Sequence, residues 1–172
     1  MEEDTRNVID RYKNWSIDLI KDQLKKDCFP YIVCMENIIG DFNMGTVIRN
    51  ANAFGASKVY FIGKRKWDRR GAVGSYHYTD FIHISTVEEL LLLKEEGYSF
   101  IGLDNVKNSV PMEKFSWPRK TLMIFGEEGN GITPEVLSVC DHIVAITQYG
   151  SVRSLNAGTA SGIAMFDYTN KF

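Results

Sequence analysis

After Pro30, hydrophobic residues gather in short runs that have the length of β-strands. Stretches with helical spacing of apolar and polar positions separate these runs. Strands that alternate with helices are typical of an α/β fold with a mostly parallel sheet flanked by helices. The expected strands are 31–35, 58–62, 81–84, 100–103, 122–125 and 142–146.

Helices are expected between these strands and at both ends of the chain. Apolar residues recur at helical spacing over 8–24, which predicts an amphipathic N-terminal helix, and 46–54 also reads as helical. Thr86 begins a capping-box pattern, and Thr133 stands as a cap before a first-turn proline. Small residues over 154–168 favour a last helix that packs closely against other backbone.

The length of the chain indicates one compact domain, and its net charge indicates a weak overall electrostatic field. With 172 residues, 44% of them hydrophobic, the chain can fill one core. We therefore expect a single domain over 1–172, with 1–28 as an N-terminal helical extension. The 22 acidic and 20 basic residues nearly cancel, so any nucleic-acid site must be a local patch.

Cysteine usage and the absence of targeting signals bear on the compartment. Cys28, Cys34 and Cys140 are odd in number and widely spaced, with no companion histidine pair for zinc. No apolar run approaches the roughly 20 residues of a membrane span, and the acidic, polar start does not resemble a signal peptide. The sequence predicts a soluble cytoplasmic protein without a metal or a membrane partner.

The common nucleotide and hydrolase motifs are missing. There is no P-loop motif and no Gly-x-Gly-x-x-Gly after a strand, which disfavours kinases, ATPases and ordinary dehydrogenases. Nor is there a His-Glu-x-x-His or a Gly-x-Ser-x-Gly motif. Metal-assisted and serine hydrolysis therefore lack their usual carriers.

Three polar or glycine-rich stretches remain, and each follows an expected strand. The first carries Asn43 and Arg49 into a helix start, where free backbone N–H groups and an arginine favour phosphate or carboxylate. The second, 126–131, places glycines and two carboxylates at the carboxyl edge of the sheet, where α/β proteins bind ligands. The third brings Ser154 and Asn156 to the start of the last helix.

Each stretch also has a simpler interpretation. The first is an ordinary loop with a surface arginine, and the second is a turn that merely needs glycine. Ser154 has the simpler role of a helix cap, which is common for serine at such a position. None of the three stretches decides the function alone.

A basic segment lies between the first and second stretches. It packs five cationic residues around Trp67, a pattern that favours phosphate contacts and base stacking. A solvated charged loop is the simpler alternative. The predicted RNA-binding residues are Lys64, Arg65, Lys66, Arg69 and Arg70.

Taken together and in this order, the three stretches resemble the motifs of the SpoU/TrmH family of RNA 2′-O-ribose methyltransferases, within the SPOUT class. The resemblance covers roughly residues 30 to 168 and joins Asn43 and Arg49 with Gly126-x-Glu128-x-x-Gly131 and Ser154-Leu155-Asn156. It implies a C-terminal trefoil knot, a homodimer and S-adenosylmethionine as cofactor. Knots are rare among folds, so this expectation rests on the resemblance.

The resemblance also implies roles for individual residues. Methyl transfer to a ribose 2′-hydroxyl would use Arg49, with Asn43, Glu128, Ser154 and Asn156 orienting it, the ribose and the loops. An arginine rarely gives up its proton, so anchoring the adjacent phosphate is the easier role for Arg49. The cofactor is expected against Phe125, Gly126, Ile146, Gly150 and Leu155.

The chain departs from the family pattern near the third stretch. Family members often have Ile-Pro-Met after the last strand, where this chain has Ile146, Thr147 and Gln148. The string from Gln148 to Asn156 resembles the branch that methylates tRNA, which favours tRNA over rRNA. The alternatives are a catalytically silent RNA-binding module of the same fold and methylation of a base or a protein.

Overall fold

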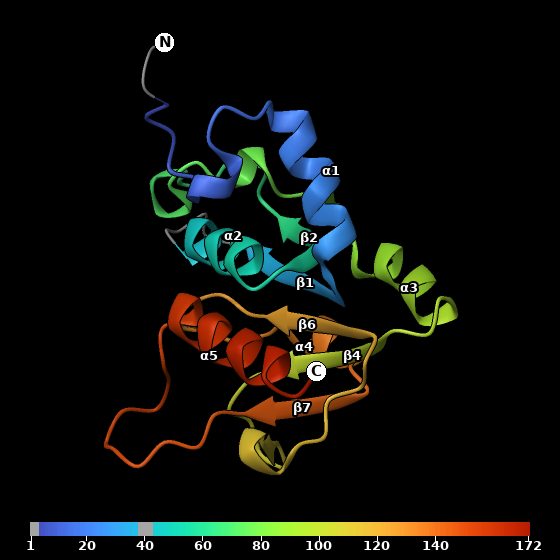
Figure 1. Ribbon diagram of the computed structural model, residues 1–172. Coiled ribbons are helices and arrows are strands. Elements are labelled where there is room, and N and C mark those ends of the chain that lie inside the picture. Colours follow the sequence, from blue (N-terminus) through green and yellow to red (C-terminus); the bar gives the residue numbers. More distant parts are fainter. Residues whose placement is uncertain (1–3, 38–42) are drawn as a thin grey trace.

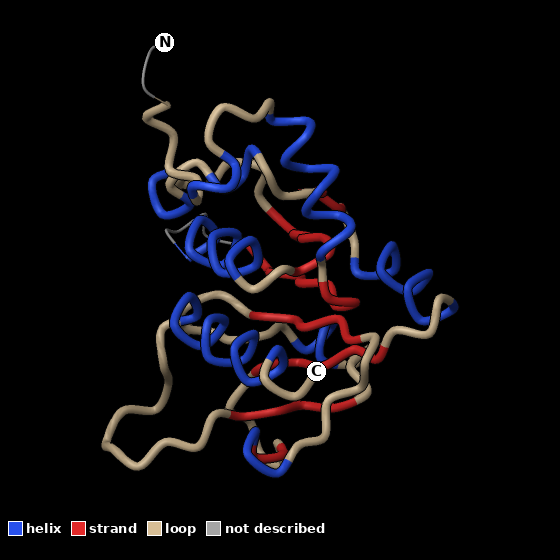
Figure 2. Tube along the Cα trace, in the orientation of Figure 1, coloured by secondary structure: helices blue, strands red, loops and turns tan. Residues whose placement is uncertain are grey.

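A seven-stranded parallel sheet forms the centre of the computed structural model, which describes residues 4–37 and 43–172 (Figures 1 and 2). The strand order is β3-β2-β1-β6-β4-β7-β5, and every paired strand runs parallel to its neighbour. The strands are β1 (Phe29–Asn37), β2 (Ala56–Gly63), β3 (Phe81–Ile84), β4 (Ser99–Leu103), β5 (Val110–Pro111), β6 (Thr121–Phe125) and β7 (His142–Ala145). All the expected strands are present. The two-residue β5 was not predicted, because it does not lie in a hydrophobic run.

Helices cover both faces of this sheet, which confirms the predicted α/β class. The α-helices are α1 (Ile17–Asp27), α2 (Asn43–Ala53), α3 (Leu91–Glu95), α4 (Pro134–Leu137) and α5 (Ala157–Thr169). The 3-10 helices are η1 (Asp10–Tyr12), η2 (Arg70–Ala72), η3 (Ser75–His77), η4 (Val87–Leu90) and η5 (Met112–Lys114). The trefoil knot stays a prediction. In the described part of the chain, no helix is long and apolar enough to cross a bilayer.

Alternation along β1 divides the core between the two faces of the sheet. Tyr31, Val33 and Met35 join the core cluster that includes residues of α2 and α5. Ile32 and Cys34 join the cluster formed with η4, α3 and α4. Successive side chains of a strand point to opposite faces, so one buried strand supplies both clusters. The result is a three-layer arrangement of helix, sheet and helix.

The prediction of one continuous N-terminal helix over 8–24 was wrong. The segment forms η1 and, after a break, α1. Asn14 adopts a left-handed conformation with φ of 64°, and Ser16 caps α1 by accepting a hydrogen bond from the Leu19 N–H at 3.2 Å. Asparagine tolerates this conformation better than most residues, so the helical periodicity is shared between two short helices.

Helices α2 and α5 pack against each other at close range. A Cβ added at Gly158 would lie 2.7 Å from the Thr46 Cγ2 atom. Asn50 on α2 donates from Nδ2 to the Gly158 carbonyl at 2.8 Å and to Ser161 Oγ at 2.9 Å. The small residues predicted for the last helix therefore allow contact with α2.

Candidate active site

The three stretches singled out from the sequence converge on one hydrogen-bonded cluster. Asn43 donates from Nδ2 to Glu128 Oε2 at 2.9 Å. Asn156 donates from Nδ2 to Asn43 Oδ1 at 2.8 Å and to Glu128 Oε2 at 3.2 Å. Asn43 begins α2, Glu128 follows β6 and Asn156 precedes α5, so three distant segments are joined here.

The cluster fixes the orientation of its amides. Glu128 accepts from both asparagines, and hydrogen bonds to an ionised carboxylate are stronger than neutral ones. Asn156 is engaged at its other end as well, because Oδ1 accepts the Thr159 N–H at 3.1 Å as the N-cap of α5. The cap of α5 is therefore Asn156, and the simpler interpretation of Ser154 as that cap was wrong.

The other two candidates lie outside the hydrogen bonds of this cluster. Arg49 is exposed on α2 and makes no hydrogen bond or ion pair within residues 4–37 and 43–172. Ser154 is exposed in the loop before α5 and lines the neighbouring cavity. The structure thus joins Asn43, Glu128 and Asn156 directly and leaves the Arg49 and Ser154 side chains free to meet a ligand.

A cavity of about 300 Å³ adjoins the cluster at the carboxyl ends of β4, β6 and β7. This is the edge at which open α/β sheets bind ligands. Of the residues expected to hold a cofactor, Phe125, Gly126, Ile146 and Leu155 line the cavity. Gly150 is exposed in the adjoining loop and is not part of the lining, so its role stays a prediction.

Glycines shape the wall that follows β6. A Cβ on Gly126 would overlap the backbone of Gly131 and Ile132, so the loop folds back closely on this position. Gly131 has φ of 70°, and a Cβ there would lie 2.5 Å from Asp104 Oδ2. The same Asp104 oxygen accepts the Ile132 N–H at 2.8 Å. The loop predicted to bind a ligand therefore also needs glycine at positions 126 and 131 for steric reasons.

Comparison with known proteins gives the family. A model of the SpoU rRNA Methylase family matches residues 30–166. The chain belongs to this family. The tRNA (guanosine(18)-2′-O)-methyltransferase of Aquifex aeolicus is 26% identical over 153 residues, which are 86% of this chain and 72% of that protein. The Escherichia coli K12 enzyme with the same name is 27% identical over 139 residues, covering 78% of this chain and 61% of its own length.

Solved structures agree on the fold. The A. aeolicus TrmH/SpoU tRNA modifying enzyme superposes with a TM-score of 0.80 at 23% identity, covering 90% of this chain and 81% of that one. The Streptomyces viridochromogenes SpoU methyltransferase AviRb, solved in complex with AdoMet, gives a TM-score of 0.74 at 22% identity. That match covers 83% of this chain and 58% of AviRb. The SpoU fold is thus shared across the sheet and its helices.

This SpoU domain buries two carboxylates, of which Glu36 was missed from the sequence and Glu127 was noted there only as part of the 126–131 stretch. Glu36, in β1, accepts the Thr133 N–H at 2.8 Å and the Thr133 hydroxyl at 2.6 Å. Burial raises the pKa of Glu36, although the bonds from Thr133 oppose this effect. Glu127 accepts from Asn130 Nδ2 at 3.1 Å. A carboxylate inside a buried strand demands a partner, and for Glu36 that was the available signal.

The five predicted RNA-binding residues are all exposed, but they differ in their contacts. Arg70 pairs with Asp68 at 2.6 Å, and the Arg69 guanidinium lies 5.4 Å from the centre of the Tyr76 ring. Trp67 packs edge-on against Tyr76 and Phe81 and belongs to the core cluster. The half-buried Trp67 ring therefore anchors the segment to the core, and its expected stacking on bases stays a prediction.

The basic segment is fixed to the elements that carry the active site. Asn37, at the end of β1, donates from Nδ2 to the Lys64 carbonyl at 2.5 Å and the Lys66 carbonyl at 3.3 Å. A Cβ at Gly45 on α2 would lie 2.8 Å from the Ala72 nitrogen. The segment therefore holds a defined position beside α2. Among the described residues, no group of His, Cys, Asp and Glu side chains could hold a metal ion.

Proposed function

We propose that this chain transfers a methyl group from S-adenosylmethionine to a ribose 2′-hydroxyl of structured RNA, with tRNA favoured over rRNA. The observation that carries the proposal is the cluster of Asn43, Glu128 and Asn156 beside a cavity at the carboxyl edge of the sheet. Family membership and relatives named as tRNA 2′-O-methyltransferases support it. The unit proposed to act is the single domain 1–172, with 1–28 as its extension.

The cavity fits the proposed cofactor in size and in the chemistry of its lining. Ligand pockets usually hold about 300–1,000 Å³, and this one has about 300 Å³. The absence of a Cβ at Gly126 brings backbone groups close to one wall. We assign the hold on the cofactor to Phe125, Gly126, Ile146 and Leu155, with Gly150 from the adjoining loop. When bound, S-adenosylmethionine supplies an electrophilic methyl group on sulfur.

The chain's own residues would bring the ribose into place. Glu128 holds the amides of Asn43 and Asn156, so this side of the site is ordered before RNA arrives. Arg49 remains protonated and anchors the phosphate beside the reacting ribose, and Ser154 contacts the ribose from the loop. Correct placement of the hydroxyl can supply much of the reduction in the reaction barrier.

RNA binding is assigned to the basic segment. Lys64, Arg65 and Lys66 are exposed, whereas Arg70 is already engaged by Asp68. Replacing Lys64, Arg65 and Lys66 together by glutamate should weaken RNA binding and reduce its salt slope by roughly 1 for each phosphate that is no longer neutralised. Lys26→Glu, at an exposed lysine on α1, gives the effect of one charge reversal elsewhere, and the triple variant should weaken binding by more than three such changes together. Equal affinities for both proteins would remove this segment from the RNA site.

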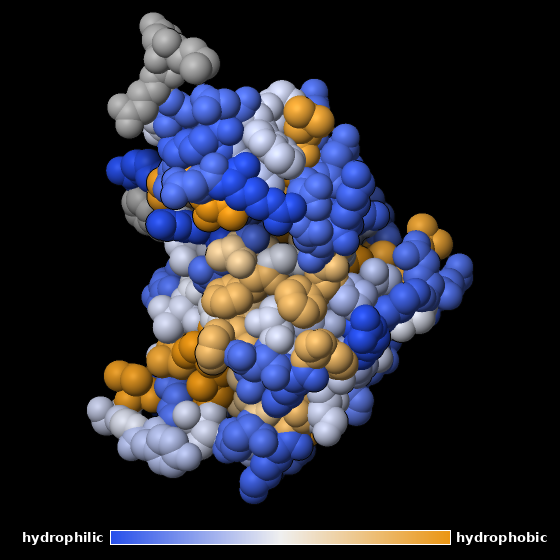
Figure 3. Space-filling model, viewed as in Figure 1, coloured by the Kyte–Doolittle hydropathy of each residue, from blue (hydrophilic) through white to orange (hydrophobic). Residues whose placement is uncertain are grey.

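A homodimer is proposed on the face formed by α2 and α5. Ile163 is 38% exposed and Phe166 is 58% exposed on α5, and Phe166 meets Phe54 with ring centroids 6.3 Å apart. Figure 3 shows hydrophobic surface gathered over α2 and α5, while the surface around α1 is mostly hydrophilic. Phe166→Asp should shift sedimentation from dimer to monomer, whereas Leu92→Asp on α3 should not. A wild-type monomer would overturn the assignment.

The assigned location is the cytoplasm. The thiols of Cys28, Cys34 and Cys140 are all free, which suits a reducing compartment.

Methyl transfer from labelled S-adenosylmethionine to bulk tRNA or rRNA, followed by nucleoside mass spectrometry, tests the function. We expect a 2′-O-methylated nucleoside whose formation falls by about 100-fold in Arg49→Ala, the scale for losing one charge-stabilising donor. Lys26→Ala serves as the matched control. A methyl group on a base or a protein would contradict the proposed acceptor. RNA binding without cofactor binding or transfer would favour the silent module.

A further inference from the structure

Gln148 lines the cavity and holds one polar atom without a partner. Its Nε2 donates to the Arg153 carbonyl at 3.3 Å. Its Oε1 is buried, and in the described part of the chain no hydrogen-bond donor reaches it. A backbone carbonyl only accepts, so the contact with Arg153 fixes which end of the amide is turned away from it. The oxygen is therefore the end left to interact.

The neighbouring loop does not depend on Gln148 alone. Asn105, which follows β4, also donates from Nδ2 to the Arg153 carbonyl, at 2.9 Å. This second bond is shorter than the one from Gln148, so it can hold the loop over the cavity by itself. If Gln148 served only to hold the loop through the Arg153 carbonyl, its Oε1 would stay unpaired. An unpaired buried acceptor is unfavourable, because it has given up water without gaining another donor.

The chemistry of the lining indicates which donor would meet this oxygen. Leu103, Ile146 and Leu155 provide apolar walls suited to a planar ring, whereas Glu127 and Glu128 lie on the loop after β6 and suit a cationic group. A neutral amide suits a neutral donor. Side-chain amides are the usual partners of the adenine amino group, because the amide oxygen accepts from it.

We propose that Gln148 is a specificity residue for the cofactor, accepting a hydrogen bond from the 6-amino group of its adenine. The inference rests on the proposed use of S-adenosylmethionine. It concerns a position where this chain departs from the family, since Gln148 stands where methionine is common. Gln148 thus adds a side-chain contact to a site otherwise lined largely by backbone and apolar groups.

Calorimetry with the product of the cofactor and with its deaminated analogue tests the proposal. S-adenosylhomocysteine carries the 6-amino group, and S-inosylhomocysteine carries a carbonyl oxygen in its place. The ratio of their Kd values is measured for the wild type, for Gln148→Met and for Asn105→Ala. Methionine matches glutamine in length and lacks the acceptor, while Asn105→Ala removes the other bond to the Arg153 carbonyl and leaves Oε1 in place.

The wild type should prefer the adenine compound, and Gln148→Met should reduce this preference by about tenfold, the effect of one hydrogen bond. Asn105→Ala should raise the Kd values of both compounds by the same factor, so that their ratio stays unchanged. An unchanged preference in Gln148→Met, with both compounds bound, would overturn the proposal. If the wild type binds neither S-adenosylhomocysteine nor S-adenosylmethionine, the proposed function itself fails.

Discussion

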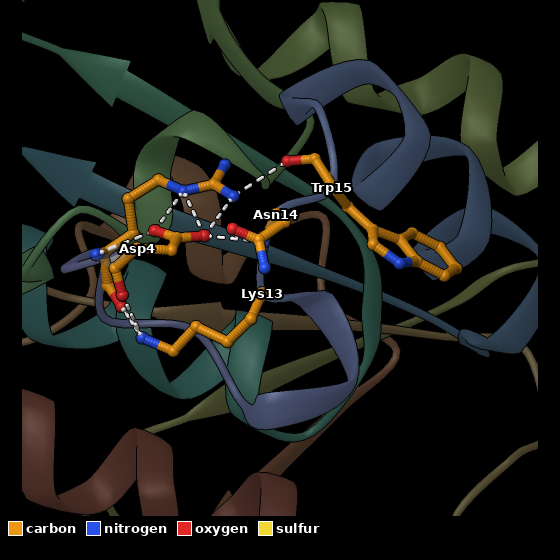
Figure 4. A network of polar contacts seen from close by, with 5 residues as sticks. Asp4, Lys13, Asn14 and Trp15 are labelled. Carbon is orange, nitrogen blue, oxygen red and sulfur yellow. Dashed lines mark hydrogen bonds and ion pairs between the residues drawn. The ribbon is translucent and has the colours of Figure 1, made fainter. Parts of the chain in front are cut away.

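The N-terminal extension and the α2–α5 pair are held in place by different forces. Besides the buried side chains of Tyr12 and Ile20, charged groups hold the extension. Asp4 accepts from Arg6 and from the Asn14 N–H, and Lys13 Nζ donates to the Asp4 and Arg6 carbonyls (Figure 4). On α1, Lys21 and Lys25 reach Asp80 at 3.2 and 3.6 Å. These contacts are partly or fully exposed, and such ion pairs contribute little to stability.

The α2–α5 pair depends on close approach. Gly158 leaves space for Thr46, and Asn50 bridges the two helices with two hydrogen bonds. A buried bond of this kind is costly to lose, because the group left behind has no water to replace its partner. Since α2 begins with Asn43 and α5 is capped by Asn156, the packing also sets the distance between two members of the candidate active-site cluster. The packing of α2 against α5 therefore both stabilises the fold and positions Asn43 and Asn156, whereas the exposed ion pairs of the N-terminal segment contribute little to either.

The largest effect is expected at the loop that joins this pair to the cavity. Gly126→Ala places a Cβ on the backbone of Gly131 and Ile132, which cannot move aside as a flexible side chain can. We expect a loss of about 3 kcal/mol in the free energy of unfolding together with loss of cofactor binding. Urea unfolding and calorimetry provide the measurements. Gly150→Ala, where an added Cβ meets nothing within 4 Å, should leave the unfolding free energy unchanged; equal losses would contradict this account.

A smaller effect is expected at the bridge between the helices. Asn50→Ala removes both bonds to α5 and should cost about 1.5 kcal/mol in the free energy of unfolding. Asn52→Ala is the matched control, because Asn52 lies on the same helix and makes a 3.3 Å bond to Thr79 Oγ1. Urea midpoints should fall further for Asn50→Ala. The opposite order would show that the helix contact matters less than the geometry indicates.

The smallest effect is expected in the extension, and it should depend on pH. The hydrogen bond from Arg6 holds the pKa of Asp4 well below its usual value of 3.8. A carboxylate with a lowered pKa stabilises the fold above its usual pKa, and the contribution is lost as the pH falls through the lowered value. The Tm of Asp4→Asn should therefore lie slightly below that of the wild type at neutral pH, and the gap should close in acid. A gap that widens in acid would contradict this sign.

Six of the seven strands were predictable because each contains a short, mainly apolar run, and β3 was predicted with its observed bounds. The break between η1 and α1 could not be predicted, because hydrophobic periodicity does not indicate the left-handed conformation of Asn14. The packing of Trp67 against Tyr76 and Phe81 was also not predictable, because composition does not show which side chains a ring contacts. Gln148 was visible only as a departure from the family, since its unpaired oxygen is a property of the folded loop.

The convergence of Asn43, Glu128 and Asn156 in the candidate active site could not be derived from local patterns. Its members were named from the resemblance, because no local pattern says that Asn43, Glu128 and Asn156 share hydrogen bonds. Local periodicity fixes elements, whereas long-range contacts depend on how those elements are connected. Only the three-dimensional structure showed that Arg49 and Ser154 stand apart from these bonds.

The hydrogen bonds of the cluster join residues that are synthesised at different times. Glu128 follows Asn43 by 85 positions and Asn156 follows it by 113. At usual rates of protein synthesis, about 6 to 20 seconds pass between the first and last of these residues. During that interval α2 emerges before the helix that completes its contacts. The three-residue cluster is therefore complete only after α5 has been synthesised and has docked against α2.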